Sequence, residues 1–320
     1  MNMYMDYLVS NMVHLIGNAV TRPIATIFTL HRVCTLEKDN LSACEELSVD
    51  PEFLDNFIKL SRRRGYNFIS MDDLVSVLLS EKRIEKAFVI SIDDGYKDTY
   101  STAYPILKKQ NVPFIFFVST SFPDRTAILW WYVIQELITN NNVIVLTDGR
   151  KISCATLSEK QKAFTTLRRI ILRMGRHVQE RIPHMLSRYD NNLHWQNSKL
   201  MIDWEDIITM SKDELCTIGA HTEKHFGLRF ETAENVLGDF LLCKSKLENK
   251  IGMQVRHLSF PYGSAYSVGC RESYLAAKAG FTTAVTTYSG VCHGLHRYML
   301  HSLPRVNFTQ GSCMQKYIWD

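Results

Sequence analysis

Paired cysteines are missing from this sequence, although cysteine itself is not rare. The eight cysteines stand at positions 34, 44, 154, 216, 243, 270, 292 and 313, and none forms a CxxC pair, which argues against a zinc knuckle. A chain of 320 residues does not need a disulfide framework to fold. We therefore interpret the thiols as mostly reduced and expect a cytoplasmic protein.

Strong charge and long apolar runs are missing as well. A net charge of +4 gives no argument for a nucleic-acid partner. The apolar-leaning residues 1–23 lack a basic start and contain Asp6 and His14, so they fit neither a signal peptide nor a membrane span. We expect a short amphipathic helix there, with peripheral membrane contact as the alternative.

Short apolar strands alternate with helices along most of the chain. Strands are expected at 24–30, 66–70, 87–92, 112–118, 216–220, 257–260 and 282–287. Helices are expected at 50–64, 71–80, 98–111, 231–250 and 270–279. This alternation predicts an α/β fold with a parallel sheet, and the number of units favours a barrel over an open sheet.

Residues 125–200 break that alternation. They contain Trp130-Trp131, a polar stretch around 139–151 and long basic helical runs. We interpret this region as a helical insertion within a single domain that spans residues 1–320. The basic run at 160–185 is typical of a solvated helix face, and it would gain importance if the substrate were lipid-linked at a membrane.

Two adjacent aspartates, Asp93 and Asp94, end a strand that reads as buried. Like charges repel, so a cation, a proton or a substrate must offset their proximity. The stretch HTEKH at 221–225 also follows a strand directly, and two histidines four residues apart can face one metal ion. Asp94 would join His221 and His225 as a ligand, while Asp93 stays ionised and accepts a proton from water.

These motifs, in this order, resemble the polysaccharide deacetylase family, the NodB-homology carbohydrate esterases. The resemblance rests on IDDG at 92–95, HTEKH at 221–225 and FPYG at 260–263. It extends from about residue 24 to 308, with LHRV at 30–33, similar to the YHRV-like opening of a bacterial subgroup, and LPRV at 303–306. It implies a distorted (β/α)7-type barrel and metal-dependent removal of N- or O-acetyl groups from sugars.

The resemblance also implies roles for individual residues. Asp93 would be the general base, and the ligands of a divalent ion, with Zn²⁺ favoured, would be Asp94, His221 and His225. Pro261 and Tyr262 of FPYG would line the substrate site, and the Tyr262 N–H would stabilise the oxyanion of the tetrahedral intermediate.

The sequence departs from the family pattern at three points. Position 92 is Ile where Phe is usual. The arginine that often precedes FPYG and braces the base is absent, so we expect Arg305 of LPRV to take that role. The histidine that supplies the general acid is not fixed by a motif, and His31 and His301 are the two candidates. Trp204 and the Trp130-Trp131 pair would either stack on a sugar ring or anchor the core.

The function favoured by the sequence is a sugar N-deacetylase that acts on a precursor or lipid-linked glycan. Two alternatives remain: a hydrolase of a non-sugar C–N amide bond, and a non-catalytic carbohydrate-binding relative. The second is disfavoured because a pure binding protein does not need a base beside the metal ligands.

Overall fold

The computed structural model describes residues 23–35, 48–80, 84, 86–189 and 198–309. The amphipathic helix expected near the start of the chain lies outside these residues. Within the described ranges, no helix combines the length and the apolar character needed to cross a membrane. In the described part of the chain, the cysteines at 34, 154, 216, 243 and 292 are free thiols.

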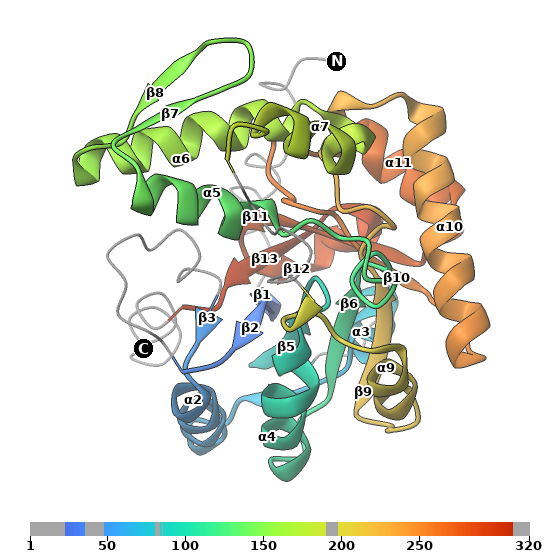
Figure 1. Ribbon diagram of the computed structural model, residues 1–320. Helices are drawn as coiled ribbons and strands as arrows, with labels where there is room; N and C mark the ends of the chain where they lie inside the picture. Colours follow the sequence, from blue (N-terminus) through green and yellow to red (C-terminus); the bar gives the residue numbers. More distant parts are fainter. Residues whose placement is uncertain (1–22, 36–47, 81–83, 85, 190–197, 310–320) are drawn as a thin grey trace.

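Seven parallel strands close into a barrel (Figure 1). In order around the barrel they are β1 (Pro23–Leu30), β5 (Ala87–Ile92), β6 (Phe114–Val118), β9 (Cys216–Ala220), β10 (His257–Ser259), β11 (Thr283–Ser289) and β13 (Leu303–Asn307). The barrel closes because β13 pairs with β1 in parallel. The closure is uneven: β9 and β10 are paired at one position, and the register of β11 against β13 shifts. The predicted distorted (β/α)7-type barrel is confirmed.

The barrel interior is apolar in its lower part and polar near the carboxyl ends of the strands. Alternate residues of a strand share a face, so the row of β5 that contains Val89 also contains Ser91 and Asp93. Apolar residues of the other strands pack with Val89 in one buried cluster: Ala25, Ile27, Ile115, Phe117, Val285 and Leu303. The row of β13 that contains Leu303 continues to Arg305. The strand period therefore brings Asp93 and Arg305 to the same end of the barrel.

Helices cover the outside of the barrel: α2 (Pro51–Arg63), α3 (Met71–Leu79), α4 (Tyr104–Lys109), α9 (Trp204–Ser211), α10 (Ala233–Ile251) and α11 (Cys270–Lys278). The start of α2 was predicted correctly, because Asp50 accepts hydrogen bonds from Glu52 N and Phe53 N and Pro51 occupies the first turn. The helix predicted over 98–111 is instead a π-helical turn, η2 (Thr99–Ala103), followed by α4. Pro105 in the first turn of α4 has no N–H to donate, which interrupts the regular ladder there.

The remaining elements are short. Two-residue strands are β2 (Arg32–Val33), β3 (Ser48–Val49), β4 (Asn67–Phe68) and β12 (Cys292–His293). Short 3₁₀ turns are η3 (Gly175–His177), η4 (Leu228–Phe230), η5 (Gly294–Tyr298) and η6 (Leu300–Ser302). β12 pairs antiparallel with the start of β1, and β4 extends the sheet beside β5.

The insertion contains three helices, α5 (Trp130–Asn140), α6 (Leu157–Leu172) and α7 (Val178–Met185), which lie together along one side of the barrel (Figure 1). The insertion was expected to be helical, but it also contains a hairpin formed by β7 (Val143–Val145) and β8 (Lys151–Ser153). Asp148-Gly149 makes the turn, with Gly149 at a φ of +86° that glycine adopts without strain. The buried apolar residues of α5 and α6 belong to the same cluster as the barrel's outer layer.

Candidate metal centre

The turn after β5 points Asp93 and Asp94 in different directions. Asp93 continues the inward-facing row of the strand, whereas Asp94 has a φ of +80°, a left-handed conformation that non-glycine residues seldom adopt. Gly95 follows with a φ of +157°, and a Cβ there would lie 2.7 Å from the Cβ of Phe122. Local strain of this kind persists only where the surrounding structure enforces it, and it is concentrated at functional sites.

The loop after β9 is bent in a similar way. Thr222 and His225 have φ values of +68° and +51°, and the hydroxyl of Thr222 accepts a hydrogen bond from His225 N at 3.1 Å. Asp239 of α10 fixes the middle of the loop by accepting hydrogen bonds from the backbone N–H groups of Glu223 and Lys224 at 2.8 and 3.2 Å. The loop thereby turns back on itself, and the two imidazole rings lie with centroids 5.0 Å apart.

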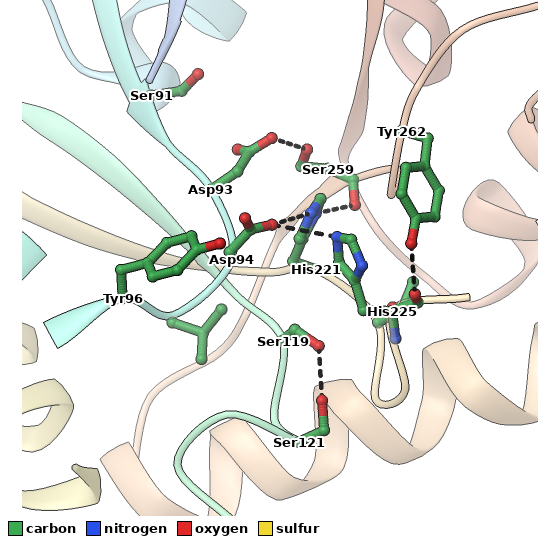
Figure 2. A network of polar contacts seen from close by, with 12 residues as sticks. Ser91, Asp93, Asp94, Tyr96, Ser119, Ser121, His221, His225, Ser259 and Tyr262 are labelled. Carbon is green, nitrogen blue, oxygen red and sulfur yellow. Dashed lines mark hydrogen bonds and ion pairs between the residues drawn. The ribbon is translucent and has the colours of Figure 1, made fainter. Parts of the chain in front are cut away.

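Three side chains from these two loops converge on one point (Figure 2). The Oδ1 atom of Asp94 lies 3.2 Å from His221 Nε2 and 3.1 Å from His225 Nε2. All three side chains are buried, and their ligand atoms lie within 4.8 Å of one another. The structure therefore brings together the three residues that the sequence nominated as ligands.

The chemistry of this cluster fits a divalent cation. Although the distances are short, Asp94 Oδ1 makes no hydrogen bond of acceptable geometry among the described residues, and neither does His225 Nδ1. A buried carboxylate oxygen without a donor is costly, and a cation placed among the three ligand atoms would remove that cost. His221 Nδ1 lies 2.8 Å from the carbonyl oxygen of Ser259, which fixes the proton on Nδ1 and leaves Nε2 free to bind a metal.

Asp93 lies beside this cluster in a fully paired arrangement. The guanidinium of Arg305 donates to both of its carboxylate oxygens, at 2.8 and 2.7 Å, and the Ser259 hydroxyl donates to Oδ2 at 2.9 Å. Burial alone would raise the pKa of Asp93, but the charge and hydrogen bonds of Arg305, together with the His221 imidazole, outweigh it and lower that pKa. Asp93 is therefore held ionised. Its Oδ1 accepts a single hydrogen bond, which leaves that atom able to accept one more.

Arg305 is itself held rigidly, as expected of a residue that orients another. It is 1% exposed, and it also donates to Thr286 O, Ser91 Oγ and Ser259 Oγ at 2.9, 3.1 and 3.0 Å. The structure places it beside Asp93, where the sequence predicted a bracing arginine.

A cavity of about 610 Å³ opens above these groups. Its walls come from the carboxyl ends of the barrel strands and from the insertion helices α5 and α6, and they include Thr29, His31, Asp93, Asp94, Trp130, Trp131, Gln161, Phe164, Thr165, Arg168, His221, His225 and Tyr262. A volume of this size suits a small ligand or one or two sugar units.

His31, placed at the end of β1, lines the cavity. Burial lowers the pKa of its imidazole, although the negative charges of Asp94 and Asp93 act in the opposite direction.

The FPYG turn presents Tyr262 to the cavity. Tyr262 has a φ of +61° and its hydroxyl donates to the carbonyl of His225 at 3.3 Å. Gly263 follows at +51°, where a Cβ would lie 2.6 Å from the backbone nitrogen of Thr287. Among the backbone hydrogen bonds of the described residues, none uses the Tyr262 N–H, so this group is available to a ligand.

The tryptophan pair of the insertion is packed into the core and also reaches the cavity. Trp130 and Trp131 are mostly buried and also line the cavity. Trp130 Nε1 donates to the Tyr262 hydroxyl at 3.2 Å, and Trp131 Nε1 donates to the Tyr96 hydroxyl at 2.9 Å. The Trp131 ring lies 5.6 Å from that of His225, so the pair fixes the cavity wall next to the histidines.

Three residues predicted for the site lie elsewhere. His301 is engaged through Nε2 with the carbonyl of Phe281 at 2.8 Å and lines a separate hollow, so it lies away from the groups that surround Asp94. Trp204 donates to Asp124 Oδ1 at 2.9 Å and packs under Lys250 without reaching the cavity. Pro261 is buried in the turn and does not line the cavity either.

Other residues of the site were missed by the sequence reasoning. Ser259, which pairs with Asp93, lies two residues after His257 on β10, and strand alternation could have found it. Gln161, Phe164, Thr165 and Arg168 recur at helical spacing on α6, a signal that the basic character of this helix concealed.

Comparisons with known proteins agree with this geometry. A family model described as polysaccharide deacetylase matches residues 80–284, more than half of the chain. The curated YxkH protein of Bacillus subtilis, provisionally named a polysaccharide deacetylase, is 32% identical over 71 residues, which are 22% of this chain and 25% of YxkH. The match thus spans about a quarter of that relative's length.

Two solved structures share the fold along nearly the whole chain. The deacetylase PplD of Streptococcus pyogenes, solved in complex with acetate, has a TM-score of 0.61 and 16% identity, covering 90% of this chain and 93% of PplD. IcaB from Ammonifex degensii has a TM-score of 0.61 and 17% identity, covering 93% of this chain and 97% of IcaB. At these identities the likeness establishes the barrel fold.

Proposed function

The chain belongs to the polysaccharide deacetylase family, and on that premise we propose that it is a metal-dependent hydrolase that removes acetyl groups, N-acetyl in the first place, from a sugar or glycan precursor. The observation that carries the proposal is the convergence of Asp94, His221 and His225 beside the ionised and braced carboxylate of Asp93. Asp94, His221 and His225 would bind the cation, and Asp93, which is not one of these ligands, would act as the base. Membership of the subgroup with the YHRV-like opening is part of the proposal.

The divalent ion, for which Zn²⁺ is the first choice, would be held by Asp94 Oδ1 and the two histidine Nε2 atoms. When bound, it would act as a Lewis acid toward the acetyl carbonyl and lower the pKa of a neighbouring water. Asp93 accepts the proton of the attacking water through Oδ1, the oxygen with spare capacity. Arg305 keeps that carboxylate ionised and prevents it from rotating.

Two further groups complete the acyl-transfer chemistry. The unused N–H of Tyr262 would donate to the oxyanion of the tetrahedral intermediate. His31 would return a proton to the leaving amine, because it is the imidazole that lines the cavity apart from the two ligand histidines. Trp130 and Trp131 form the cavity wall beside these groups and limit the access of other water.

The test is acetate release from a panel of N- and O-acetylated sugars and nucleotide sugars, with and without a chelator. The proposal expects release that the chelator abolishes and that added Zn²⁺ restores. Release from non-sugar acetamides alone would favour the amide hydrolase instead. Tight sugar binding without release would favour the non-catalytic relative.

A cytoplasmic location also remains a proposal. The free thiols at 34, 154, 216, 243 and 292 are the form that a reducing compartment preserves.

A further inference from the structure

One face of α6 lies over the mouth of the cavity. Gln161, Phe164, Thr165 and Arg168 all line it, at the spacing that places residues on one side of a helix. The residues on an adjoining side, Ala163, Leu167 and Ile171, are buried in the core. The insertion therefore presents a defined stripe of side chains to whatever enters the cavity.

Arg168 differs from the other charged residues that line the cavity. Asp93 is paired with Arg305, and Asp94 faces the two ligand histidines. The guanidinium of Arg168 instead lies over the ring of Tyr262, 5.9 Å from its centroid, and no carboxylate of the described residues pairs with it. The cavity mouth thus carries a positive charge that no acidic side chain in the described part of the chain neutralises.

The position of this charge relates it to the metal centre. The Tyr262 ring, which Arg168 covers, lies 4.9 Å from the ring of His225. Arg168 therefore contacts the Tyr262 ring, and that ring in turn contacts His225, one of the proposed metal ligands. An acetyl group at the metal centre would place the rest of its sugar in the same cavity that Arg168 lines.

We infer that the substrate is an acetylated amino sugar that carries an oxyanion, a phosphate ester or a carboxylate, and that Arg168 recognises this group. The inference rests on the proposed function and narrows its substrate class. A guanidinium forms two parallel hydrogen bonds to either oxyanion, and the contact with the Tyr262 ring places this guanidinium at the cavity wall.

The competing explanation is that Arg168 merely fastens α6 to the FPYG turn. Arg173, which caps the C-terminus of α6, provides the matched control, because its Nε donates to the Tyr266 hydroxyl at 3.2 Å while the residue lies outside the cavity. A fastening role predicts similar consequences for both arginines. A recognition role predicts a substrate-dependent consequence for Arg168 alone.

The experiment measures binding and turnover of three matched probes by the metal-loaded protein. They are the neutral methyl glycoside of N-acetylglucosamine, N-acetylglucosamine 1-phosphate, and the methyl glycoside of N-acetylglucosaminuronic acid. Calorimetry gives Kd and acetate release gives kcat and KM, for the wild type, Arg168→Gln, Arg168→Lys and Arg173→Gln.

The wild type is expected to bind at least one anionic probe about tenfold more tightly than the neutral one, which is the order expected of one charge-assisted pair. Whether the phosphate or the carboxylate is preferred identifies the source of the oxyanion. Arg168→Gln should abolish the preference by raising Kd and KM with kcat nearly unchanged, Arg168→Lys should retain part of it, and Arg173→Gln should retain all of it.

Equal binding of the neutral and anionic probes by the wild type would overturn the inference, as would an equal loss of kcat on all probes in Arg168→Gln. If the anion preference is found by calorimetry but no probe releases acetate, the recognition role of Arg168 stands and the proposed deacetylation fails. The two failures are therefore distinguishable.

Discussion

Replacing Asp239 with asparagine tests how the metal-binding loop is held in place. Asp239 is 8% exposed, and burial raises its pKa from 3.8 to about 7, although the N–H groups of Glu223 and Lys224 partly counteract that rise. Because the folded state binds this proton more tightly than the unfolded state, the stability that it contributes is fully present below pH 3.8 and is lost as the pH rises to about 7. At about 1.4 kcal/mol per pH unit, the loss amounts to about 4 kcal/mol.

The Asp239→Asn variant lacks this titration but leaves one of two backbone donors without an acceptor oxygen. We expect a constant cost of about 1–3 kcal/mol from that donor. The free energy of unfolding of the wild type should therefore exceed that of the variant by the largest amount near pH 4. This difference should shrink or reverse by pH 8.

Urea unfolding of both proteins from pH 4 to 8, in the presence of a chelator, measures this difference. Glu234→Gln, an exposed change on the same helix, keeps Asp239 and should keep the wild-type dependence on pH. A difference that stays flat, or one that grows with pH, would refute the reasoning. Since Asp239 holds the loop between the two ligand histidines, the asparagine variant should also bind the metal about 10- to 100-fold more weakly.

Three further changes test other parts of the site. Arg305→Met leaves the buried Asp93 carboxylate unpaired, so urea unfolding at pH 7 should show a loss of about 3–5 kcal/mol; a loss below 1 kcal/mol would contradict the described pairing. His31→Ala should remove the alkaline limb of the pH–rate profile while His301→Ala leaves it intact, and the reverse result would return the acid role to His301. Gly263→Ala should lower kcat for acetate release without loss of the barrel's circular dichroism signal, because an added Cβ would lie 2.6 Å from a backbone nitrogen and must displace the FPYG turn; unchanged kcat would show that the turn does not position the reacting groups.

The features that the sequence predicted well depend on short-range patterns. The strands that end in Asp93 and precede His221 are short apolar runs, and each motif follows its strand without a gap. Because the carboxyl ends of parallel strands meet at one end of a barrel, the approach of Asp94 to the two histidines followed from placing the strands correctly. Arg305 could be expected beside Asp93 for the same reason.

The features that the sequence missed depend on partners distant in the chain. His301 precedes β13, whereas Asp93 and His221 follow their strands, and its ring lies against the carbonyl of Phe281, a contact that no local pattern reveals. Trp204 is likewise engaged by Asp124, 80 positions away. The stripe on α6 that ends at Arg168 reads as an ordinary solvated face until the fold places it over the cavity.

The hairpin within the insertion was missed for a different reason. Its strands are three residues long, and they alternate too briefly for a period to be recognised. The Asp148-Gly149 turn was the available signal, and it was read as part of a polar stretch.

The most direct test of the central claim is a joint measurement of bound metal and acetate release for Asp93→Asn, with Asp94→Asn as its counterpart. If Asp93 is the base and Asp94 a ligand, Asp93→Asn should retain one equivalent of divalent metal and lose roughly two to four orders of magnitude in kcat. Asp94→Asn should lose the metal itself. Near-normal turnover in Asp93→Asn, or full metal content in Asp94→Asn, would contradict the account.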